Sequence, residues 1–379
     1  MCAYVFVRAD MSACIRALTS VCVRAKGTFQ INICETKNLI EAEGYPAEKH
    51  HVVTKDGYIL EMHRIPFGKS SPNSRNRPVV FLMHGILGAS NSFIYLGPEY
   101  SIAYNLADAG YDVWMGNARG TRNSRQHVSL NPDRNKSFFD FTFEEIALDD
   151  LPSMFDYMLA HTGQQKFHYI GHSQGGTVFL VLNSMSSAYH SKIASAHLLA
   201  GVGYQKNFPN YSLRTLALSA DALYSVLWLG GSVELYPPGS TAMFGKSGSR
   251  GSIDDLFGID TSSGLIAGAA TKQIVHFGQN IRDKAFRRWD YGYVQNLVKY
   301  GKLSPTSYDL SKINIDVTLH YSLNDALLSE SDVLLMAKDM PKATARKISR
   351  DSFTHLDYVT SKDVKVLLND YIIQALRNS

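Results

Sequence analysis

Beyond Cys34 this chain contains no cysteine, because all four of its cysteines lie among the first 34 residues. The long remainder therefore needs no disulfide and offers no cysteine ligands for a metal ion. Cysteine usage thus gives no evidence for an oxidising compartment.

The chain also lacks a long apolar run and a concentration of basic side chains. No stretch approaches the ~18 uninterrupted apolar residues of a membrane-spanning helix, so no transmembrane span is predicted. The formal net charge is only +4, and residues 1–34 contain four basic residues against one acidic residue. The remaining sequence is close to neutral and has no basic patch, which excludes nucleic acid as an expected partner.

Residues 1–34 form an irregular start to the chain. The apolar stretch MCAYVFV is followed by Arg8 and Asp10, and the stretch MSACIRALTSVCV is interrupted by Arg16. Neither stretch makes the apolar centre of a secretory signal peptide. The arginine-rich, acid-poor composition loosely fits a targeting peptide, and a wrongly assigned first exon explains the segment equally well.

The rest of the sequence has an ordinary globular composition, 45% hydrophobic and 19% charged, and it alternates strands with helices from about residue 50. Such alternation predicts an α/β fold with a mainly parallel sheet and right-handed crossovers. Residues that carry chemistry are then expected at the carboxyl ends of strands. The expected elements are a hairpin (strands 51–54 and 58–63), strands at 79–83, 111–115 and 167–170, and helices at 102–109 and 143–161.

The alternation stops after residue 199. Residues 200–305 mix Pro-Pro and Gly-Ser-rich stretches with apolar pieces, which predicts a separate, mostly helical insertion. A strand at 315–321, a helix at 332–338, a strand at 345–348 and a final helix at 364–376 follow.

Residues 168–179 read HYIGHSQGGTVF, a strand that turns sharply into a helix at Ser173. A serine on such a turn is held in an unfavourable backbone conformation that lifts its hydroxyl clear of the sheet. Side chains two residues before and after it would collide, so Gly171 and Gly175 are required. A glycine-rich turn with an ordinary surface serine is the alternative, and these five residues alone do not decide between the two.

A serine hydroxyl needs an imidazole to take its proton and a carboxylate to fix the tautomer of that imidazole. In this type of sheet the acid and then the base follow the serine, on loops after later strands. Asp325 lies just past the strand at 315–321, whereas Asp309 and Asp316 precede that strand at the wrong edge. Asp325 is therefore the candidate acid.

The candidate base is His355, which lies between the strand at 345–348 and the final helix. His320 lies inside a strand and is interpreted as a packed core histidine. Taken singly, the carboxylate of Asp309, Asp316 or Asp325 would ordinarily be a solvated surface charge. The order and placement of the serine, the acid and the histidine together predict a triad of Ser173, Asp325 and His355.

The tetrahedral intermediate also needs two N–H donors, each worth roughly 3 kcal/mol of the barrier. One candidate is the backbone N–H of Gln174, directly after the serine. The other is the N–H of Ile86, in the glycine-containing loop HGILG at 84–88, although this loop could also be a simple strand-ending turn. His84 and His172 are interpreted as residues that brace the site and do not touch the substrate.

Several longer motifs occur together: EGYP at 43–46, HVVTKDGY at 51–58, HG at 84–85, AGYDVWMGNARG at 109–120, GHSQG at 171–175 and HLD at 355–357. In combination they resemble the acid lipase family, the gastric and lysosomal acid lipases and their insect relatives, within the α/β-hydrolase superfamily. The resemblance extends from about residue 35 to the C-terminus.

The resemblance implies a serine hydrolase that cleaves carboxylic esters of neutral lipids, triacylglycerols or cholesteryl esters, at a lipid–water interface. Ser173, Asp325 and His355 fall on the family's catalytic motifs, and Ile86 and Gln174 fall on its oxyanion positions. The implied organisation is the irregular segment 1–34, a first core part 35–199, a cap and lid 200–305, and a second core part 306–379.

Two other functions remain open: a carboxylesterase for short soluble esters, and a non-catalytic lipid-binding protein on the same fold. An epoxide hydrolase or dehalogenase is disfavoured, because the nucleophile position holds serine and not aspartate. The expected mechanism needs no metal or organic cofactor. The resemblance implies a secreted or lysosomal protein, and only on that route would the sequons at Asn135 and Asn210 be glycosylated.

Overall fold

The computed structural model describes residues 35–70, 76–238, 240 and 264–378 of the chain. The irregular segment 1–34, with its expected targeting or wrongly assigned start, lies outside the described residues. No described helix combines the length and the apolar character needed to cross a membrane.

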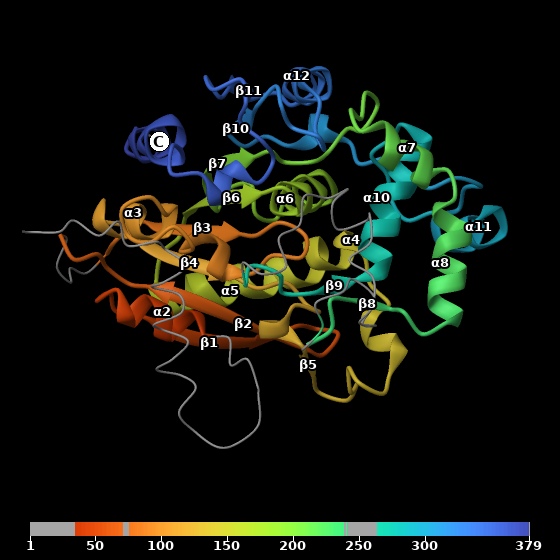
Figure 1. Cartoon of the computed structure of the whole chain (residues 1–379), viewed down its shortest axis with the longest axis horizontal. Helices are drawn as coiled ribbons and strands as arrows, with labels where there is room; N and C mark the ends of the chain where they lie inside the picture. Colours follow the sequence, from red (N-terminus) through yellow and green to blue (C-terminus); the bar gives the residue numbers. More distant parts are fainter. Residues whose placement is uncertain (1–34, 71–75, 239, 241–263, 379) are drawn as a thin grey trace, which may run out of the picture.

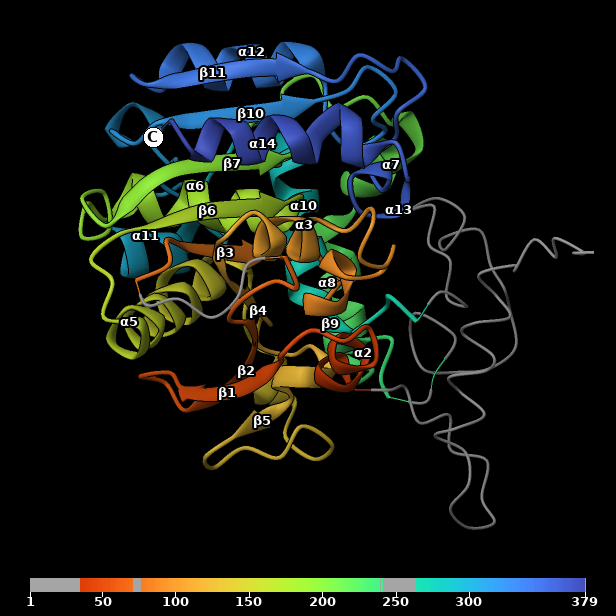
Figure 2. The same cartoon turned by 90° about the vertical axis from the view of Figure 1, so that its left-hand side faces the viewer.

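Within the described residues, a nine-stranded sheet runs through the centre of the molecule (Figure 1, Figure 2). The strand order is β1-β2-β4-β3-β6-β7-β10-β11, with β5 beside β2. The pairs from β4 to β11 are parallel, and β2 is antiparallel to each of its neighbours. The strands are β1 (Glu48–Val53), β2 (Tyr58–Ile65), β3 (Val79–Met83), β4 (Asp112–Gly116), β5 (Gln126–His127), β6 (Phe167–His172), β7 (Ile193–Leu199), β10 (Val317–Tyr321) and β11 (Ala343–Lys347).

The mainly parallel α/β fold predicted from the sequence is thus confirmed. The central strands β3, β4 and β6 are buried at every position, as continuous apolar runs covered on both faces should be. The edge strand β1 instead alternates between half-buried and exposed residues. The predicted hairpin is also correct, since β1 and β2 pair on either side of the turn at Lys55-Asp56-Gly57.

Helices cover both faces of the sheet (Figure 1). On one face, α3 (Ile102–Asp108) packs with the C-terminal helical segment, which consists of a π-helical turn (Lys365–Asn369) and α14 (Asp370–Leu376). The amide of Asn369 joins the two by donating to Tyr100 O at 2.9 Å and Asn105 Oδ1 at 3.0 Å. On the other face, α5 (Leu151–Thr162) and α6 (Gln174–Met185) pack through a shared π-helical turn. α12 (Glu330–Asp339) lies beside β10 and β11.

The helix predicted at 143–161 is present but interrupted. A short α4 (Phe143–Glu145) leads into a π-helical turn (Ile146–Asp150) before α5 begins. Thr142 and Glu145 form a capping box at its start, and Gly163 ends it in the left-handed conformation. The π turn ends at Asp150, whose buried carboxylate binds Arg119 at 2.7 Å.

A mostly helical insertion separates β7 from β10, and we call its described part the cap. Its elements are α7 (Tyr211–Ala217), α8 (Ala220–Leu229), the two-stranded pair β8 (Glu234–Leu235) and β9 (Ala269–Ala270), α10 (Thr271–Asp283) and α11 (Tyr293–Tyr300). Helix α10 packs on both α7 and α8. The domain boundaries at residues 199 and 305 stay predictions.

Candidate active site

Ser173 lies on the turn between β6 and α6, at the carboxyl end of a central parallel strand. Its backbone has φ 52° and ψ −115°, a conformation that L-residues adopt only under constraint. The constraint includes a hydrogen bond in which the Ser173 N–H donates to Leu199 O at 2.9 Å. The strained turn that the sequence predicts is therefore present.

The two flanking glycines are required for the steric reason expected from the sequence. A Cβ on Gly171 would lie 2.6 Å from the backbone carbonyl of Gly175. A Cβ on Gly175 would lie 2.1 Å from Met83 O, at the end of the neighbouring strand β3. These contacts are with backbone atoms of helix α6 and of the central sheet, which cannot move aside easily.

The side chains of Ser173, His355 and Asp325 form a continuous hydrogen-bonded row. The Ser173 hydroxyl donates to His355 Nε2 at 2.8 Å, and His355 Nδ1–H donates to Asp325 Oδ2 at 2.8 Å. All three residues are buried. Asp325 lies just past β10, where its other oxygen accepts the N–H of Leu327 at 2.8 Å, so its carboxylate is fixed in place.

His172 braces this row, and His84 braces the loop beside it. His172 Nε2–H donates to the backbone oxygen of His355 at 3.0 Å, and burial lowers the pKa of His172 to about 3. His84 Nδ1–H donates to Gly85 O at 2.7 Å, while its Nε2 accepts the N–H of Ala118 at 3.0 Å. Burial also lowers the pKa of His84, to about 4. Both imidazole rings are therefore uncharged near neutral pH and act through their hydrogen bonds.

The loop that carries Ile86 lies directly against the serine. A Cβ on the neighbouring Gly85 would lie only 3.0 Å from Ser173 Cβ, so glycine lets this backbone approach. Among the hydrogen bonds between described backbone groups, none uses the N–H of Ile86 or of Gln174. Both N–H groups are thus available to a ligand beside Ser173.

One residue of the site gives no signal in the sequence. Gln273 lies on cap helix α10, and its Nε2 donates to the side-chain oxygen of Gln174 at 3.1 Å. Its own Oε1 accepts the N–H of Ala270 at 2.8 Å. Both glutamines are buried. The cap therefore contacts the residue directly after Ser173.

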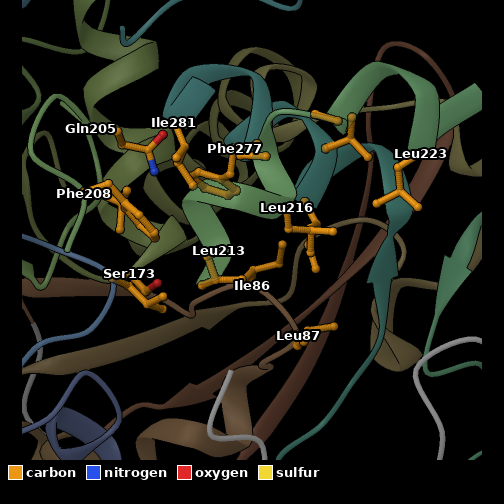
Figure 3. A pocket seen from close by; sticks show the side chains of 17 residues that line it. Ile86, Leu87, Ser173, Gln205, Phe208, Leu213, Leu216, Leu223, Phe277 and Ile281 are labelled. Atoms are coloured by element: carbon orange, nitrogen blue, oxygen red, sulfur yellow. The ribbon is translucent and has the colours of Figure 1, made fainter. Parts of the chain in front are cut away.

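A largely apolar pocket opens beside Ser173 and extends under the cap (Figure 3). It encloses about 850 Å³ of space free of protein atoms, part of it open to solvent. Its walls come mainly from α7, α8, α10 and the loop at Ile86. Figure 3 shows Phe208, Leu213 and Phe277 grouped around the space next to Ser173.

A second cluster of potential ligand atoms lies at the edge of the sheet, where Glu48, His50 and His161 have one ligand atom each within 4.8 Å of the others. However, the guanidinium of Arg64 lies 2.8 Å from Glu48 Oε2 and 3.2 Å from His161 Nε2. A metal ion would have to sit beside this cation, so we assign no metal to the cluster.

Comparisons with known proteins concern the family and the fold of the chain. Residues 36–97 match the family model described as the partial alpha/beta-hydrolase lipase region, and residues 78–230 match the alpha/beta hydrolase fold. The chain is 37% identical to Lipase 3 of Drosophila melanogaster, over 93% of this chain and 94% of that protein. It is 34% identical to the gastric triacylglycerol lipase of Bos taurus, over 86% of each.

Among solved structures, a putative lipase from Acinetobacter baumannii superposes with a TM-score of 0.50 at 13% identity, covering 93% of this chain and all of that one. The structure of DcsB with its substrate analogue superposes with a TM-score of 0.56 at 14% identity, covering 88% and 99%. At these identities the likeness concerns the fold alone.

Proposed function

From the premise that this chain belongs to the alpha/beta-hydrolase lipase family, and so is a lipase or carboxylic ester hydrolase, we propose that it cleaves neutral lipid esters with a triad of Ser173, Asp325 and His355. The substrates are triacylglycerols or cholesteryl esters. The observation that carries the proposal is the row of two 2.8 Å hydrogen bonds from the serine through the imidazole to the carboxylate.

In the acylation step, Ser173 Oγ attacks the ester carbonyl carbon while its proton passes to His355 Nε2. The negative charge on the carbonyl oxygen is stabilised by the N–H groups of Ile86 and Gln174. The intermediate then collapses, the imidazolium gives its proton to the alkoxide, and the alcohol leaves. The acyl group remains bound to the serine.

Deacylation repeats these steps with water as the nucleophile. His355 takes a proton from the water as its oxygen attacks the acyl carbon, and returns that proton to Ser173 Oγ as the fatty acid leaves. Asp325 remains ionised throughout and stabilises the imidazolium that forms twice in each cycle. The Leu327 N–H and His355 Nδ1–H both donate to this carboxylate and hold it beside the imidazole.

The apolar pocket supports a long acyl chain as the group bound next to the serine. A short soluble ester would leave most of its walls uncovered, which disfavours the alternative of a short-chain carboxylesterase. The intact hydrogen-bonded row also argues against the other alternative, a non-catalytic lipid-binding protein.

Exposed apolar side chains of the cap support a lipid surface as the partner. Leu229 of α8 is 80% exposed and Val298 of α11 is 83% exposed. Figure 1 shows both helices at the outer edge of the molecule. Apolar groups exposed in this way favour adsorption to a lipid–water interface.

Secretion or lysosomal delivery is part of the same proposal. Asn135 is exposed and Asn210 is half-buried. Asn210 caps α7 by accepting the N–H of Leu213 through its Oδ1 at 3.0 Å, which leaves its amide nitrogen available for a glycan. Treatment of the secreted protein with a glycosidase, followed by mass measurement, would detect glycans at these two positions.

The test is to replace the nucleophile and assay a panel of esters. We expect Ser173→Ala to abolish hydrolysis of emulsified triacylglycerol and cholesteryl ester, while the buried helix serine variant Ser184→Ala retains it. Labelling of the wild-type protein by an organophosphonate, absent in Ser173→Ala, separates an enzyme from a lipid-binding protein. Full activity of Ser173→Ala would overturn the mechanism, and a preference for monomeric short esters would favour the carboxylesterase.

A further inference from the structure

Gln205 is an anomaly in the apolar pocket. Apart from Ser173, it contributes the only polar side chain among the described residues that line this space. It lies in the loop that follows β7 and is only 3% exposed. Figure 3 shows it on the far side of Phe208 from Ser173, with its amide directed toward Ile281.

Among the residues that the structure describes, the fully buried side-chain oxygen of Gln205 finds no hydrogen-bond partner. Buried polar atoms in folded proteins are almost always paired, because losing their bonds to water without replacement is costly. A leucine or methionine would fill the same volume with no such cost. A buried side-chain oxygen that lines a ligand pocket and lacks a partner among the described residues is therefore explained by a partner on the ligand.

The loop holds Gln205 in place without help from its amide. The Asn207 N–H donates to Asp332 Oδ2 at 2.8 Å, and the Asn207 amide donates to Asp332 Oδ1 at 3.0 Å. On the other side, Tyr204 OH donates to Asp339 at 2.8 Å. Since a residue on each side of Gln205 is tied to α12, the amide is presented to the pocket on a fixed backbone.

The chemistry of the pocket selects the kind of group that can pair with this amide. No ionisable side chain is among the described residues that line it, so a charged group would be bound without a counter-charge. A side-chain amide offers one acceptor oxygen and one donor nitrogen. A hydroxyl both donates and accepts, so it can pair with Gln205 in either orientation of the amide.

We propose that Gln205 forms a subsite for a hydroxyl group carried by the ester substrate. This inference rests on the proposed function, because it assumes that an ester bound at Ser173 occupies the pocket. Two substrates supply the same chemistry: a hydroxylated fatty acyl chain, and a partial glyceride with a free hydroxyl. The position of Gln205 beyond Phe208 favours the acyl chain, since the chain enters the pocket from Ser173.

The first experiment uses the wild-type enzyme and matched esters. Rates are measured for p-nitrophenyl octadecanoate and for analogues with one hydroxyl at different chain positions. A separate arm compares diacylglycerol with triacylglycerol of the same acyl chains. We expect one hydroxylated chain position to raise kcat/KM by roughly 3- to 10-fold, the factor that one neutral hydrogen bond contributes.

The second experiment removes the amide. Gln205→Met keeps the side-chain volume, and the expected result is that kcat/KM for the hydroxylated ester falls to the value that the same variant shows for the plain ester. Gln205→Leu provides a second replacement if the methionine variant folds poorly. Ile281→Met, a change in the same pocket that leaves the amide intact, should keep the preference.

The outcomes are distinct. The enzyme could prefer diacylglycerol in a way that depends on Gln205 and show no preference for hydroxylated chains. That result supports the subsite and identifies the partial glyceride as the source of the hydroxyl group. Equal rates for all matched pairs, or a preference that survives Gln205→Met, overturns the inference while leaving the ester hydrolase intact. If the wild-type protein hydrolyses neither the plain nor the hydroxylated esters, and an organophosphonate does not label Ser173, the proposed function is overturned instead.

Discussion

The side-chain amide of Gln273 donates to the side-chain oxygen of Gln174 at 3.1 Å. Gln273 belongs to cap helix α10, and Gln174 is the residue whose backbone N–H is the proposed oxyanion donor. The bond thus connects the insertion to the turn that carries Ser173, the proposed nucleophile. Since both side chains are buried, water could not replace this hydrogen bond if a mutation removed it.

Replacing Gln273 with leucine should therefore impair the chemical step more than substrate binding. We expect kcat to fall about tenfold with little change in KM, because the oxyanion donor would be less firmly oriented. Gln279→Leu is the matched control: this buried glutamine of the same helix binds Asp221 and Asp290 and makes no contact with the proposed triad. Equal losses of kcat in both variants would show that Gln273 acts only on the fold of the cap.

Asp325→Asn tests the carboxylate of the proposed triad. The amide can still contact His355, but it favours the tautomer that turns the wrong nitrogen toward Ser173. The expected loss in kcat is about three to four orders of magnitude, with an unchanged melting temperature. Asp316→Asn, at the exposed carboxylate before β10, should retain activity. Retained activity in Asp325→Asn would remove this residue from the triad.

Buried histidines should make the protein less stable in acid. Burial lowers the pKa of His84 and His168 to about 4, and that of His172, His197 and His276 to about 3. Unfolded histidine titrates near pH 6.5. Below that value the unfolded chain binds more protons than the folded one, so the stability present above about pH 6.5 is lost as the pH falls.

Urea unfolding between about pH 7 and about pH 5 measures this loss, which can reach about 1.4 kcal/mol per pH unit for each histidine that titrates only on unfolding. Replacing His168 with glutamine should reduce the pH dependence of the free energy of unfolding by up to the contribution of one proton. A free energy of unfolding that stays constant or increases on acidification over this range would contradict the expectation.

Arg119 should be a large contributor to stability. Its guanidinium is 1% exposed and donates to Asp150 Oδ1 at 2.7 Å and Asp56 Oδ2 at 2.6 Å. Arg119→Met leaves the carboxylate of Asp150 buried without its cation, at an expected cost of about 3–5 kcal/mol in denaturant unfolding. Lys192→Met breaks the exposed pair with Asp156 and should cost less than about 1 kcal/mol. Similar costs for the two variants would disprove a special role for Arg119.

The features that the sequence predicts correctly are those with a local pattern. Continuous apolar runs mark β3 and β6, and the spacing of glycines marks the turn at Ser173. The order of elements then places Asp325 and His355 after later strands. The structure brings His355 within hydrogen-bonding distance of Ser173, and Asp325 within hydrogen-bonding distance of His355. Their catalytic role stays a proposal.

Strand β7 is not predicted, for a reason that depends on its neighbours. Its sequence IASAHLL contains two polar residues that interrupt the apolar run. In the sheet, Ser195 pairs with His168 of β6 at 2.9 Å, and His197 pairs with His320 of β10 at 3.0 Å. These partners are far apart in sequence, so no local pattern shows that the polar side chains are satisfied in the core.

The same limit applies to Gln205 and Gln273. Both lie in the insertion, where the sequence predicts helices but not how they are placed on the sheet. The sequence alone does not distinguish a buried glutamine from an exposed one. Its role becomes visible only when the neighbouring side chains are known.

The insertion leaves the sheet after β7 and returns to β10, and these two strands are paired with each other. The pairing places the start and the end of the insertion side by side, and all the residue pairs between neighbouring strands of the central sheet lie outside residues 200–305. A change in that segment can therefore alter which molecules reach the serine without dismantling the scaffold that positions it. New substrate preferences can evolve, or be engineered, by exchanging this one block of sequence.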